Sequence, residues 1–426
     1  MSNPSPTEHS PAALDQADPL RSYRERFYIP ESNGIEQLYF CGNSLGLQPK
    51  SVRSALQQEL DDWARLGVEG HFHAKHPWMP YHTELREMLA AVVGAKPIEV
   101  VAMNSLTVNL HLLMVSFYRP HSQRSAIIIE QGAFPSDRYA VESQIRFHGH
   151  DPADCLIEIP SDPETGLIAV DSLKDILATH GHRTALILWP GVQYRTGQAF
   201  DLKEIVDLGH FNGCTVGFDL AHAAGNLPLN LHDSGADFAA WCSYKYLNAG
   251  PGSIAGAFVH ERHALANLPR FNGWWGQRQE SRFKMEPEFN GTPGAEGWQL
   301  SNPPIFAMAP LRASLELFHE VGMPALRRKS VLLTKYLEHL IEQRLSGVLR
   351  SITPPNSEQR GCQLSLQVLA GHETGRSLFN YLTLNGVIGD WREPDVIRLS
   401  PAPLYNRFSD CFDAVRIIEQ WAGNHG

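Results

Sequence analysis

The chain has 426 residues, a hydrophobic content of 43% and a formal net charge of -10. This length exceeds one ordinary hydrophobic core, so we expect a soluble globular protein of two or three structural units. The acidic balance argues against a nucleic-acid surface, and no uninterrupted apolar run reaches membrane-spanning length. The six scattered cysteines form no C-x-x-C pair, which argues against a zinc ribbon or a disulfide scaffold.

The N-terminal region shows few signals of independent structure. Residues 1–9 have neither the basic start nor the apolar core of a signal peptide, so we expect a cytoplasmic protein. We expect a disordered tail over residues 1–20. Residues 21–74 contain one good helix, at 51–66, and too little core to fold alone, so we expect this segment to pack on the C-terminal domain.

The central part of the chain alternates short β-rich runs with amphipathic segments, which predicts repeated βα units. We therefore expect an α/β fold with a large domain over residues 75–305, whose mainly parallel mixed sheet is flanked by helices on both faces. The expected strands are residues 100–103, 125–129, 156–159, 184–188, 214–218, 238–241 and 256–259, and the expected helices are residues 108–117, 138–147, 172–180 and 202–212.

The pattern changes after a loop at residues 301–304, where two long helical segments begin. Shorter strands and helices follow them, which predicts a second, smaller α/β domain over residues 306–426. Its expected helices are residues 306–321, 324–344, 374–385 and 410–421, and its expected strands are residues 362–369 and 396–400.

Lys245 and Asp219 each stand just beyond an expected strand, and ligands in open α/β sheets gather at such carboxyl ends. Pyridoxal phosphate (PLP) needs an amine to hold its aldehyde and a carboxylate to keep its ring nitrogen protonated. Taken singly, a lysine is most often a surface charge, and a carboxylate after a strand is often a helix cap. Together the two residues predict a PLP-dependent enzyme.

Three nearby segments offer further contacts for this cofactor. Residues 104–109 follow a strand and open a helix, so their N–H groups and the Thr107 hydroxyl suit a phosphate. Phe134 is placed to stack on the pyridine ring, and Asp137 to bond the ring hydroxyl or the substrate. The polar loop at residues 193–197 is a plausible pocket wall. Ordinary helix caps explain the first two segments as well.

A histidine-rich loop contains His71, His73 and His76. Neither paired cysteines nor an H-E-x-x-H motif accompanies these side chains, so we expect no metal site. His71 either faces the substrate or is an ordinary loop histidine. Arg398 lies in an apolar strand, where a buried guanidinium needs an anion. The carboxylate of an amino-acid substrate and a structural salt bridge both remain open for it.

The sequence resembles kynureninase, a PLP-dependent family of the aspartate-aminotransferase fold type I. The resemblance covers nearly the whole chain beyond the first twenty or so residues. The D-x-x-H motif and the lysine are shared with many relatives, including cysteine desulfurases, so they indicate only the superfamily. The narrower signals are WWG at 274–276, RFKM at 282–285 and SNPPI at 301–305, supported by GNSLGL at 42–47, FPSD at 134–137, DLAH at 219–222, SYKYLN at 243–248 and PLYN at 403–406.

The resemblance implies a role for each matched residue. Lys245 would carry the cofactor, Asp219 would pair with its ring nitrogen, and Tyr244 would lie near the cofactor phosphate. We also expect Tyr244 to take part in proton transfer. Trp274 and Asn302 would reach the cofactor from the neighbouring subunit, so the expected working unit is a homodimer with a shared site. The other cofactor contacts would be Leu106, Thr107, Phe134, Asp137 and His222, while Arg398 would hold the substrate's α-carboxylate and Ser44, His71 and Asn302 would line its aromatic end.

The reaction that the resemblance implies is hydrolysis of L-kynurenine to anthranilate and L-alanine, in tryptophan degradation or NAD biosynthesis. 3-Hydroxy-L-kynurenine, which would give 3-hydroxyanthranilate, is an open second substrate. One alternative is a cysteine desulfurase or selenocysteine lyase, which would need a reactive cysteine, whereas Cys362 begins an apolar strand. Another is a catalytically silent binding protein, which would have no chemical need for both Lys245 and Asp219.

Overall fold

The computed structural model describes residues 10–425. Residues 1–9 of the expected tail lie outside this range. The rest of that segment is ordered: α1 (Pro11–Ala17) is a helix that begins at the cap Ser10. Its Asp15 carboxylate accepts a hydrogen bond from the Phe408 N–H at 2.7 Å, and Asp18 pairs with the buried Lys329 at 2.8 Å. These contacts attach the start of the chain to its C-terminal part.

The main sheet has seven strands in the order β4-β10-β9-β8-β7-β5-β6. Every pairing from β6 through β9 is parallel, whereas β10 runs antiparallel to both of its neighbours. This confirms the expected mixed, mainly parallel sheet. The strands are β4 (Val100–Ala102), β5 (Ala126–Glu130), β6 (Leu156–Ile159), β7 (Thr184–Pro190), β8 (Thr215–Asp219), β9 (Phe238–Trp241) and β10 (Gly256–Val259).

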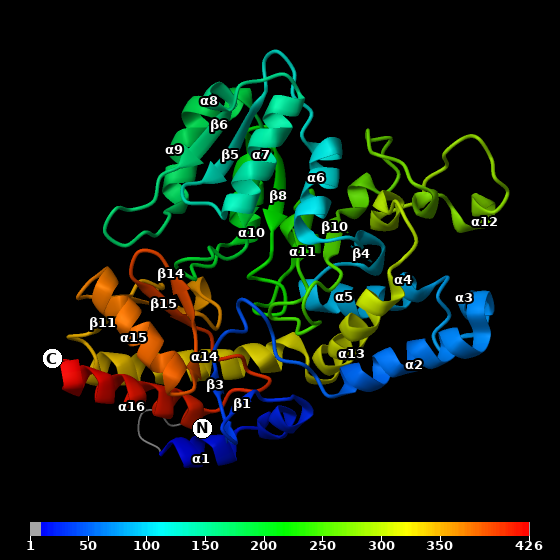
Figure 1. Ribbon diagram of the computed structural model, residues 1–426. Coiled ribbons are helices and arrows are strands. Elements are labelled where there is room, and N and C mark those ends of the chain that lie inside the picture. Colours follow the sequence, from blue (N-terminus) through cyan, green and yellow to red (C-terminus); the bar gives the residue numbers. More distant parts are fainter. Residues whose placement is uncertain (1–9, 426) are drawn as a thin grey trace, which may run out of the picture.

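Helices cover both faces of this sheet, as Figure 1 shows. Alternate residues of a strand point to opposite faces. Accordingly Ile127 and Ile129 pack with α6 and α7, whereas Ala126 and Ile128 belong to the core that includes α5, α9, α10 and α13. These helices are α5 (Arg86–Val93), α6 (Leu106–Phe117), α7 (Pro135–Phe147), α9 (Val170–His180), α10 (Leu202–Phe211) and α13 (Ile305–Val321).

A second hydrophobic core lies in the C-terminal part of the chain. A four-stranded sheet, β11-β12-β15-β14, packs there with α14, α15 and α16. Since α13 shares the core of the main sheet, the proposed domain division at about residue 306 remains a prediction. The elements are β11 (Leu349–Ser351), β12 (Leu364–Val368), β14 (Asp390–Arg392), β15 (Val396–Leu399), α14 (Met323–Arg344), α15 (His372–Leu384) and α16 (Phe408–His425).

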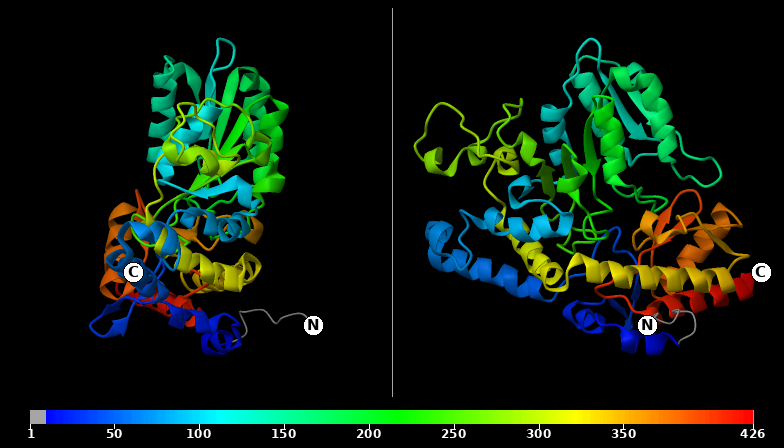
Figure 2. Two further views of the ribbon diagram at one scale, coloured as in Figure 1. Left: turned by 90° about the vertical axis from the view of Figure 1, so that its right-hand side faces the viewer. Right: turned by 180° about the vertical axis from the view of Figure 1, so that it is seen from behind.

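The segment before the main sheet contacts both parts of the molecule. β3 (Leu38–Tyr39) pairs in parallel with β13 (Val387–Ile388) of the C-terminal part. α2 (Ser51–Leu66) instead packs against α13, and Figure 2 shows this blue helix beside the yellow one. Shorter elements are β1 (Glu31–Ser32), β2 (Ile35–Glu36), α3 (Gly70–His73), α4 (Tyr81–Glu84), α8 (Pro152–Cys155), α11 (Leu231–Ser234) and α12 (Gln279–Arg282).

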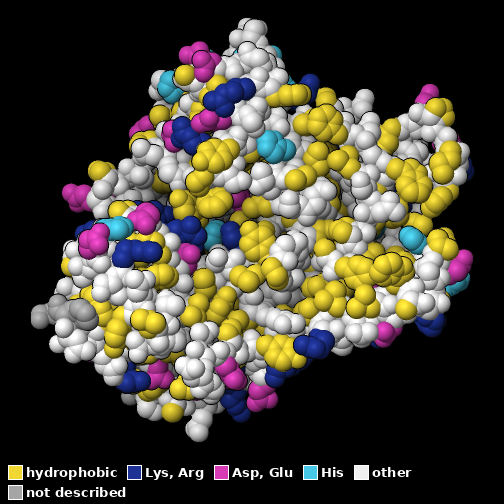
Figure 3. All heavy atoms as spheres, in the orientation of Figure 1, with side chains coloured by type: hydrophobic (Ala, Val, Ile, Leu, Met, Phe, Trp, Pro, Cys, Tyr) yellow, Lys and Arg dark blue, Asp and Glu magenta, His cyan; other side chains and the backbone are white. Residues whose placement is uncertain are grey.

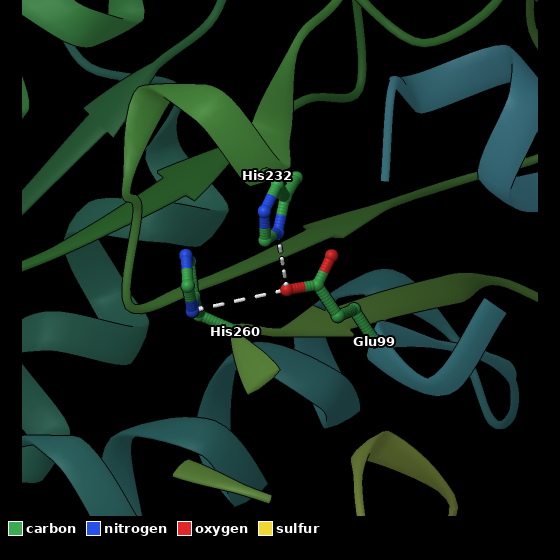
Figure 4. Close-up of side chains that lie close together, drawn as sticks. All are labelled: Glu99, His232 and His260. Atoms are coloured by element: carbon green, nitrogen blue, oxygen red, sulfur yellow. Dashed lines mark hydrogen bonds and ion pairs between the residues drawn. The ribbon is translucent and has the colours of Figure 1, made fainter. Parts of the chain in front are cut away.

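One partly buried polar cluster lies at the edge of the main sheet where β4 begins and β10 ends (Figure 4). The Glu99 carboxylate accepts hydrogen bonds from His232 Nδ1 at 2.9 Å and from the Glu261 and Lys96 N–H groups at 2.8 Å each. His260 Nδ1, 3.8 Å from that carboxylate, accepts the Arg262 N–H. The three side chains have metal-ligand spacing, but the Glu99 carboxylate, His232 Nδ1 and His260 Nδ1 already take part in hydrogen bonds, so we interpret the cluster as a structural link.

Among residues 10–425, no helix combines the length and the apolar character needed to cross a membrane.

Candidate active site

A cavity of about 370 Å³ lies at the carboxyl ends of the parallel strands, where the sheet meets the C-terminal part. Figure 3 shows Lys, Arg and His side chains gathered at the level where the upper and lower parts of the molecule meet. A larger cavity, of about 800 Å³ beside α10 and α14, contains none of the predicted site residues. The smaller cavity brings together Ser44, Leu106, Thr107, Phe134, Asp137, Asp219, His222, Tyr244 and Lys245.

Lys245 lies at the centre of this group, just beyond β9. Its Nζ is 3.1 Å from His222 Nε2, and its charge lies 6.0 Å from the Phe134 ring centre. Burial holds the pKa of His222 well below its usual range, and the Lys245 charge adds to this effect. His222 is therefore a neutral imidazole that accepts a hydrogen bond from the lysine.

Three carboxyl groups form the floor of the cavity. Asp219 ends β8, and its Oδ1 accepts the Ala221 N–H at 2.6 Å. Burial raises the pKa of Asp137 well above its usual range, and a hydrogen bond to Asp219 and the charge there raise it further. Burial also raises the pKa of Glu130, at the end of β5, to about 8. The raised pKa values therefore favour the protonated forms of Asp137 and Glu130.

Two helices begin beside the cavity. α6 starts at Leu106, and its cap residue Ser105 makes no side-chain cap bond. α7 starts at Pro135, and the Ser136 hydroxyl near its start lies 2.8 Å from the Thr107 hydroxyl. Helix N-termini carry free N–H groups and partial positive charge, so this corner suits a phosphate.

An aromatic wall borders the same cavity. The Phe134 and Tyr194 rings meet edge to face with centres 5.3 Å apart. The Tyr244 hydroxyl is half-buried, and burial raises its pKa, with Cys242 as a smaller cause. Tyr244 therefore stays protonated at neutral pH and is able to donate a proton.

The N-terminal segment completes this side of the site. Gly46 N–H donates to the Tyr244 carbonyl at 2.8 Å, which places Ser44 and Asn43 in the cavity wall. A Cβ on Gly46 would collide with the Lys245 carbonyl oxygen. Glycine at this position therefore allows the two chain segments to approach closely.

Three predicted site residues lie elsewhere in the single chain. His71 is hydrogen-bonded to the Val68 carbonyl, and Asn302 lies exposed in its loop. The Trp274 indole is 42% exposed and donates to the Arg282 carbonyl at 2.9 Å, while its neighbour Trp275 is buried. The cavity of a single chain therefore contains neither Trp274 nor Asn302, the two residues that the resemblance assigns to the neighbouring subunit.

Arg398 is fully buried behind the cavity wall. Its Nε donates to Asp390 Oδ2 and its Nη1 to the Tyr194 carbonyl, both at 2.5 Å. Arg398 therefore has the salt-bridge partner that the structural interpretation of its sequence position required. Contact with a substrate carboxylate remains a prediction for this residue.

Several lining residues were not predicted from the sequence. Glu130 had a usable signal, because it follows an apolar strand as Asp219 does. Arg392 had none, since it belongs to a three-residue strand that the hydrophobic pattern does not mark. The other unpredicted lining residues are Asn43, Ser136, Pro190, Val192 and Ala221, while Ser105 belongs to the predicted phosphate segment and Tyr194 to the loop expected to be a wall.

The residues of the cavity fit PLP. Among the described residues, the buried atoms Asp137 Oδ1 and His222 Nδ1 have no hydrogen-bond partner. Buried polar atoms without partners are rare in proteins, so these two suit contacts with a bound polar group. Lys245 would hold the aldehyde, Asp219 the ring nitrogen and the start of α6 the phosphate.

Comparison with solved structures supports the same fold. A cysteine desulfurase from Escherichia coli aligns with 98% of this chain and 99% of its own, with a TM-score of 0.74 at 18% identity. A C-DES variant, with glycine covalently linked to its PLP cofactor, aligns with 90% of this chain and 96% of its own, with a TM-score of 0.76 at 19% identity. Fold and site together define a PLP-dependent enzyme.

Closer relatives narrow this class to one family. Residues 326–418 match the family model described as the kynureninase C-terminal domain. A kynureninase from Xanthomonas campestris pv. campestris is 60% identical over 422 residues, which cover 99% of each chain. The chain belongs to the kynureninase family.

Proposed function

We propose that the protein hydrolyses the Cβ–Cγ bond of L-kynurenine, which releases anthranilate and L-alanine. The observation that carries this proposal is the cavity in which Lys245, Asp219 and His222 meet, in a chain 60% identical to a kynureninase along its length. 3-Hydroxy-L-kynurenine, which would give 3-hydroxyanthranilate, is the second substrate to test. The reaction would serve tryptophan degradation or NAD biosynthesis.

Different residues around the cofactor site have separate roles in the first half of the reaction. Bound PLP supplies an aldehyde that accepts the substrate amine and a ring that takes up electrons released at Cα. The Lys245 amine would hold the cofactor and would move the proton at the substrate's Cα. Asp219 would keep the ring nitrogen protonated, and Phe134 would stack on the ring.

The second half needs a proton near the substrate carbonyl while water adds to it and the carbon–carbon bond breaks. Tyr244 is our candidate, because this residue lines the cavity and burial keeps its hydroxyl protonated. Leu106 and Thr107 would hold the cofactor phosphate at the start of α6. Asp137 would lie beside the ring hydroxyl, with His222 as a neutral neighbour of Lys245.

Substrate contacts complete the assignment. Ser44 already lines the cavity, whereas His71 and Asn302 do not. Arg398 lies behind the wall that carries Tyr194 and would hold the α-carboxylate. Ser44, His71 and Asn302 would meet the aromatic end of the substrate.

We further propose that the working unit is a homodimer with a shared active site. Trp274 and Asn302 are exposed and do not line their own chain's cavity. Exposed aromatic pairs support this proposal: Trp63 stands 5.9 Å from Phe306, and Trp274 stands 5.3 Å from Phe283. The right-hand side of Figure 3 shows hydrophobic side chains over this region, and clusters of this kind mark interfaces. We place the dimer in the cytoplasm.

The desulfurase alternative gains no support from the cysteines. Cys362 is fully buried, and burial raises its thiol pKa to about 12. A cysteine that attacks a substrate must be accessible and easily ionised. Although the protein shares its fold with desulfurases, Cys362 is therefore not the reactive thiol that a desulfurase would need.

The proposed function is tested by mixing the PLP-loaded protein with L-kynurenine and following anthranilate fluorescence and L-alanine release. We expect both products in equal amounts. A parallel assay with 3-hydroxy-L-kynurenine ranks the two substrates by kcat/KM. Release of sulfide from L-cysteine, with no anthranilate from kynurenine, would contradict the proposal.

A further inference from the structure

Two arginines share one carboxylate in the cavity wall that the C-terminal part supplies. Asp390 on β14 lies directly opposite Arg398 on β15. The Asp390 Oδ2 atom accepts Arg398 Nε at 2.5 Å and Arg392 Nε at 2.9 Å. Arg392 is two residues beyond Asp390 on the same strand, so both side chains leave the same face of the sheet.

The charges of this group do not cancel. Among the described residues, the ion pairs of Arg392 and Arg398 both go to Asp390. Two guanidinium groups and one carboxylate leave one net positive charge, and a guanidinium removed from water favours an anionic partner. The group therefore has capacity for one more carboxylate.

Only Arg392 of the two arginines reaches the cavity. Arg398 is fully buried and does not belong to the lining. The Arg392 side chain is 33% exposed, lines the cavity and lies 5.7 Å over the Tyr194 ring. A ligand in the cavity would thus meet the guanidinium of Arg392 directly.

The sheet side of the cavity holds the groups that the proposed function assigns to the cofactor. Asp219 at the end of β8 and Lys245 just beyond β9 both line it, so Arg392 is the cationic side chain left for an anionic group of the ligand. A substrate whose amine takes the place of Lys245 on the cofactor would have the carboxylate of the same carbon drawn towards Arg392. This arrangement would orient an α-amino acid.

We propose that Arg392 is a second carboxylate-binding residue, which together with Arg398 forms a two-arginine clamp bridged by Asp390. This inference rests on the proposed function, in which Arg398 alone was assigned to the α-carboxylate. Planar guanidinium groups bind carboxylates through paired N–H donors. Arg392 supplies the accessible donors of the clamp, and Asp390 is a positioning residue that fixes both arginines.

The clamp is tested with the PLP-loaded variants Arg392→Gln and Arg392→Lys and with the matched control Arg376→Gln. Arg376 stands on α15 over the Trp391 ring and outside the cavity lining. We expect Arg392→Gln to raise the KM for L-kynurenine about tenfold or more while kcat changes little, because a lost charged hydrogen-bond pair weakens binding by this order. The lysine variant should recover part of the loss, and the control should match the wild type.

A second measurement separates carboxylate recognition from local damage. Binding of the decarboxylated amine of kynurenine, followed by the cofactor's visible absorbance, should be equal in wild type and Arg392→Gln. Equal loss of affinity for both ligands, or an unchanged KM for kynurenine, would overturn the clamp.

This test remains informative if the wild type fails to cleave kynurenine. That result would refute the proposed function but not the clamp, because binding of L-alanine and of ethylamine can be compared by the same absorbance. The clamp predicts that Arg392→Gln weakens only the binding of L-alanine. Equal binding of L-alanine by both proteins would refute it.

Discussion

Lys245 is the residue on which the proposed chemistry depends most directly. Replacing it with alanine removes both the cofactor's anchor and the group that moves the α-proton. We expect Lys245→Ala to lower kcat by about a thousandfold or more, as is typical for loss of an activated nucleophile or base. Anthranilate release measures this effect, and the exposed Lys174, paired with Asp171 on α9, provides the control substitution Lys174→Ala. Near-normal turnover by Lys245→Ala would refute the assigned role.

Glu130 shows how burial alone changes the behaviour of a residue. Burial raises its pKa from 4.5 to about 8, and the charges of Asp219 and Glu158 add to the effect. Between these two values the unfolded chain binds fewer protons at this position than the folded protein does. The stability contributed by Glu130 is therefore fully present below its unfolded pKa and is lost as the pH rises through the folded value.

This behaviour predicts a pH-dependent difference between the wild type and Glu130→Gln in the cofactor-free form. Glutamine does not titrate, so we expect the Tm of the variant to rise relative to that of the wild type between about pH 5 and about pH 8. Thermal unfolding at several pH values measures the difference. Glu164→Gln, in an exposed loop, is the control. A constant difference across this pH range would show that Glu130 is ionised in the folded state.

At the scale of single residues, the sequence identified those residues whose chemistry is distinctive at the end of a recognisable strand. Lys245 and Asp219 follow recognisable strands, so their convergence could be predicted. The position of Arg392 in the site could not be predicted, because arginines are common on protein surfaces and a short strand does not distinguish this arginine from the others. Its importance depends on the register that places Asp390 opposite Arg398, and this register arises only from the folded sheet.

Among the elements, the GNSLGL segment at residues 42–47 is tightly placed against the lysine loop. We expect Gly46→Ala to displace the Lys245 backbone, since the added Cβ meets backbone atoms that cannot move independently. The variant should bind PLP at least about tenfold more weakly, because small shifts in an active site have effects of this size. Absorbance titration with PLP measures the affinity.

The matched control for this element is Gly347→Ala. A Cβ at Gly347 meets no atom within 4 Å. PLP affinity in this control should equal that of the wild type. If Gly46→Ala also bound PLP normally, the close contact between the two segments would have no influence on the cofactor site.

The long amphipathic and apolar elements were predictable from hydrophobic periodicity. For example, α2 and β9 have the bounds that the sequence indicated. β13 and β14 were missed, because strands of two or three residues have too few positions for a period to appear. The helix at Pro11–Ala17 was also missed: its stability depends on contacts with the distant residues Phe408 and Lys329.

For the whole molecule, the shared active site predicts subunit complementation. Lys245→Ala and Asn302→Ala homodimers should each be nearly inactive. If Asn302 acts in the partner's cavity, a mixed dimer of the two variants keeps one intact site. Random reassortment of equal amounts should then restore about one quarter of wild-type activity, since half of the dimers are mixed and one site of each is intact.

Unfolding and refolding the two variants together, followed by an assay of anthranilate release, measures this recovery. Each variant refolded alone is the control. The absence of any recovery in confirmed mixed dimers would show that Asn302 acts within its own chain.

The sequence by itself determined the α/β class, most long elements and the lysine–carboxylate pair, because these follow from local periodicity and from chemistry carried by few residues. Tertiary structure decided which side chains share the cavity, since strand order and register bring distant residues together. It also decided which charges are buried, and therefore that Glu130 retains a proton and that Asp390 joins two arginines. Burial and pairing are properties of the packed chain, and no local pattern encodes them.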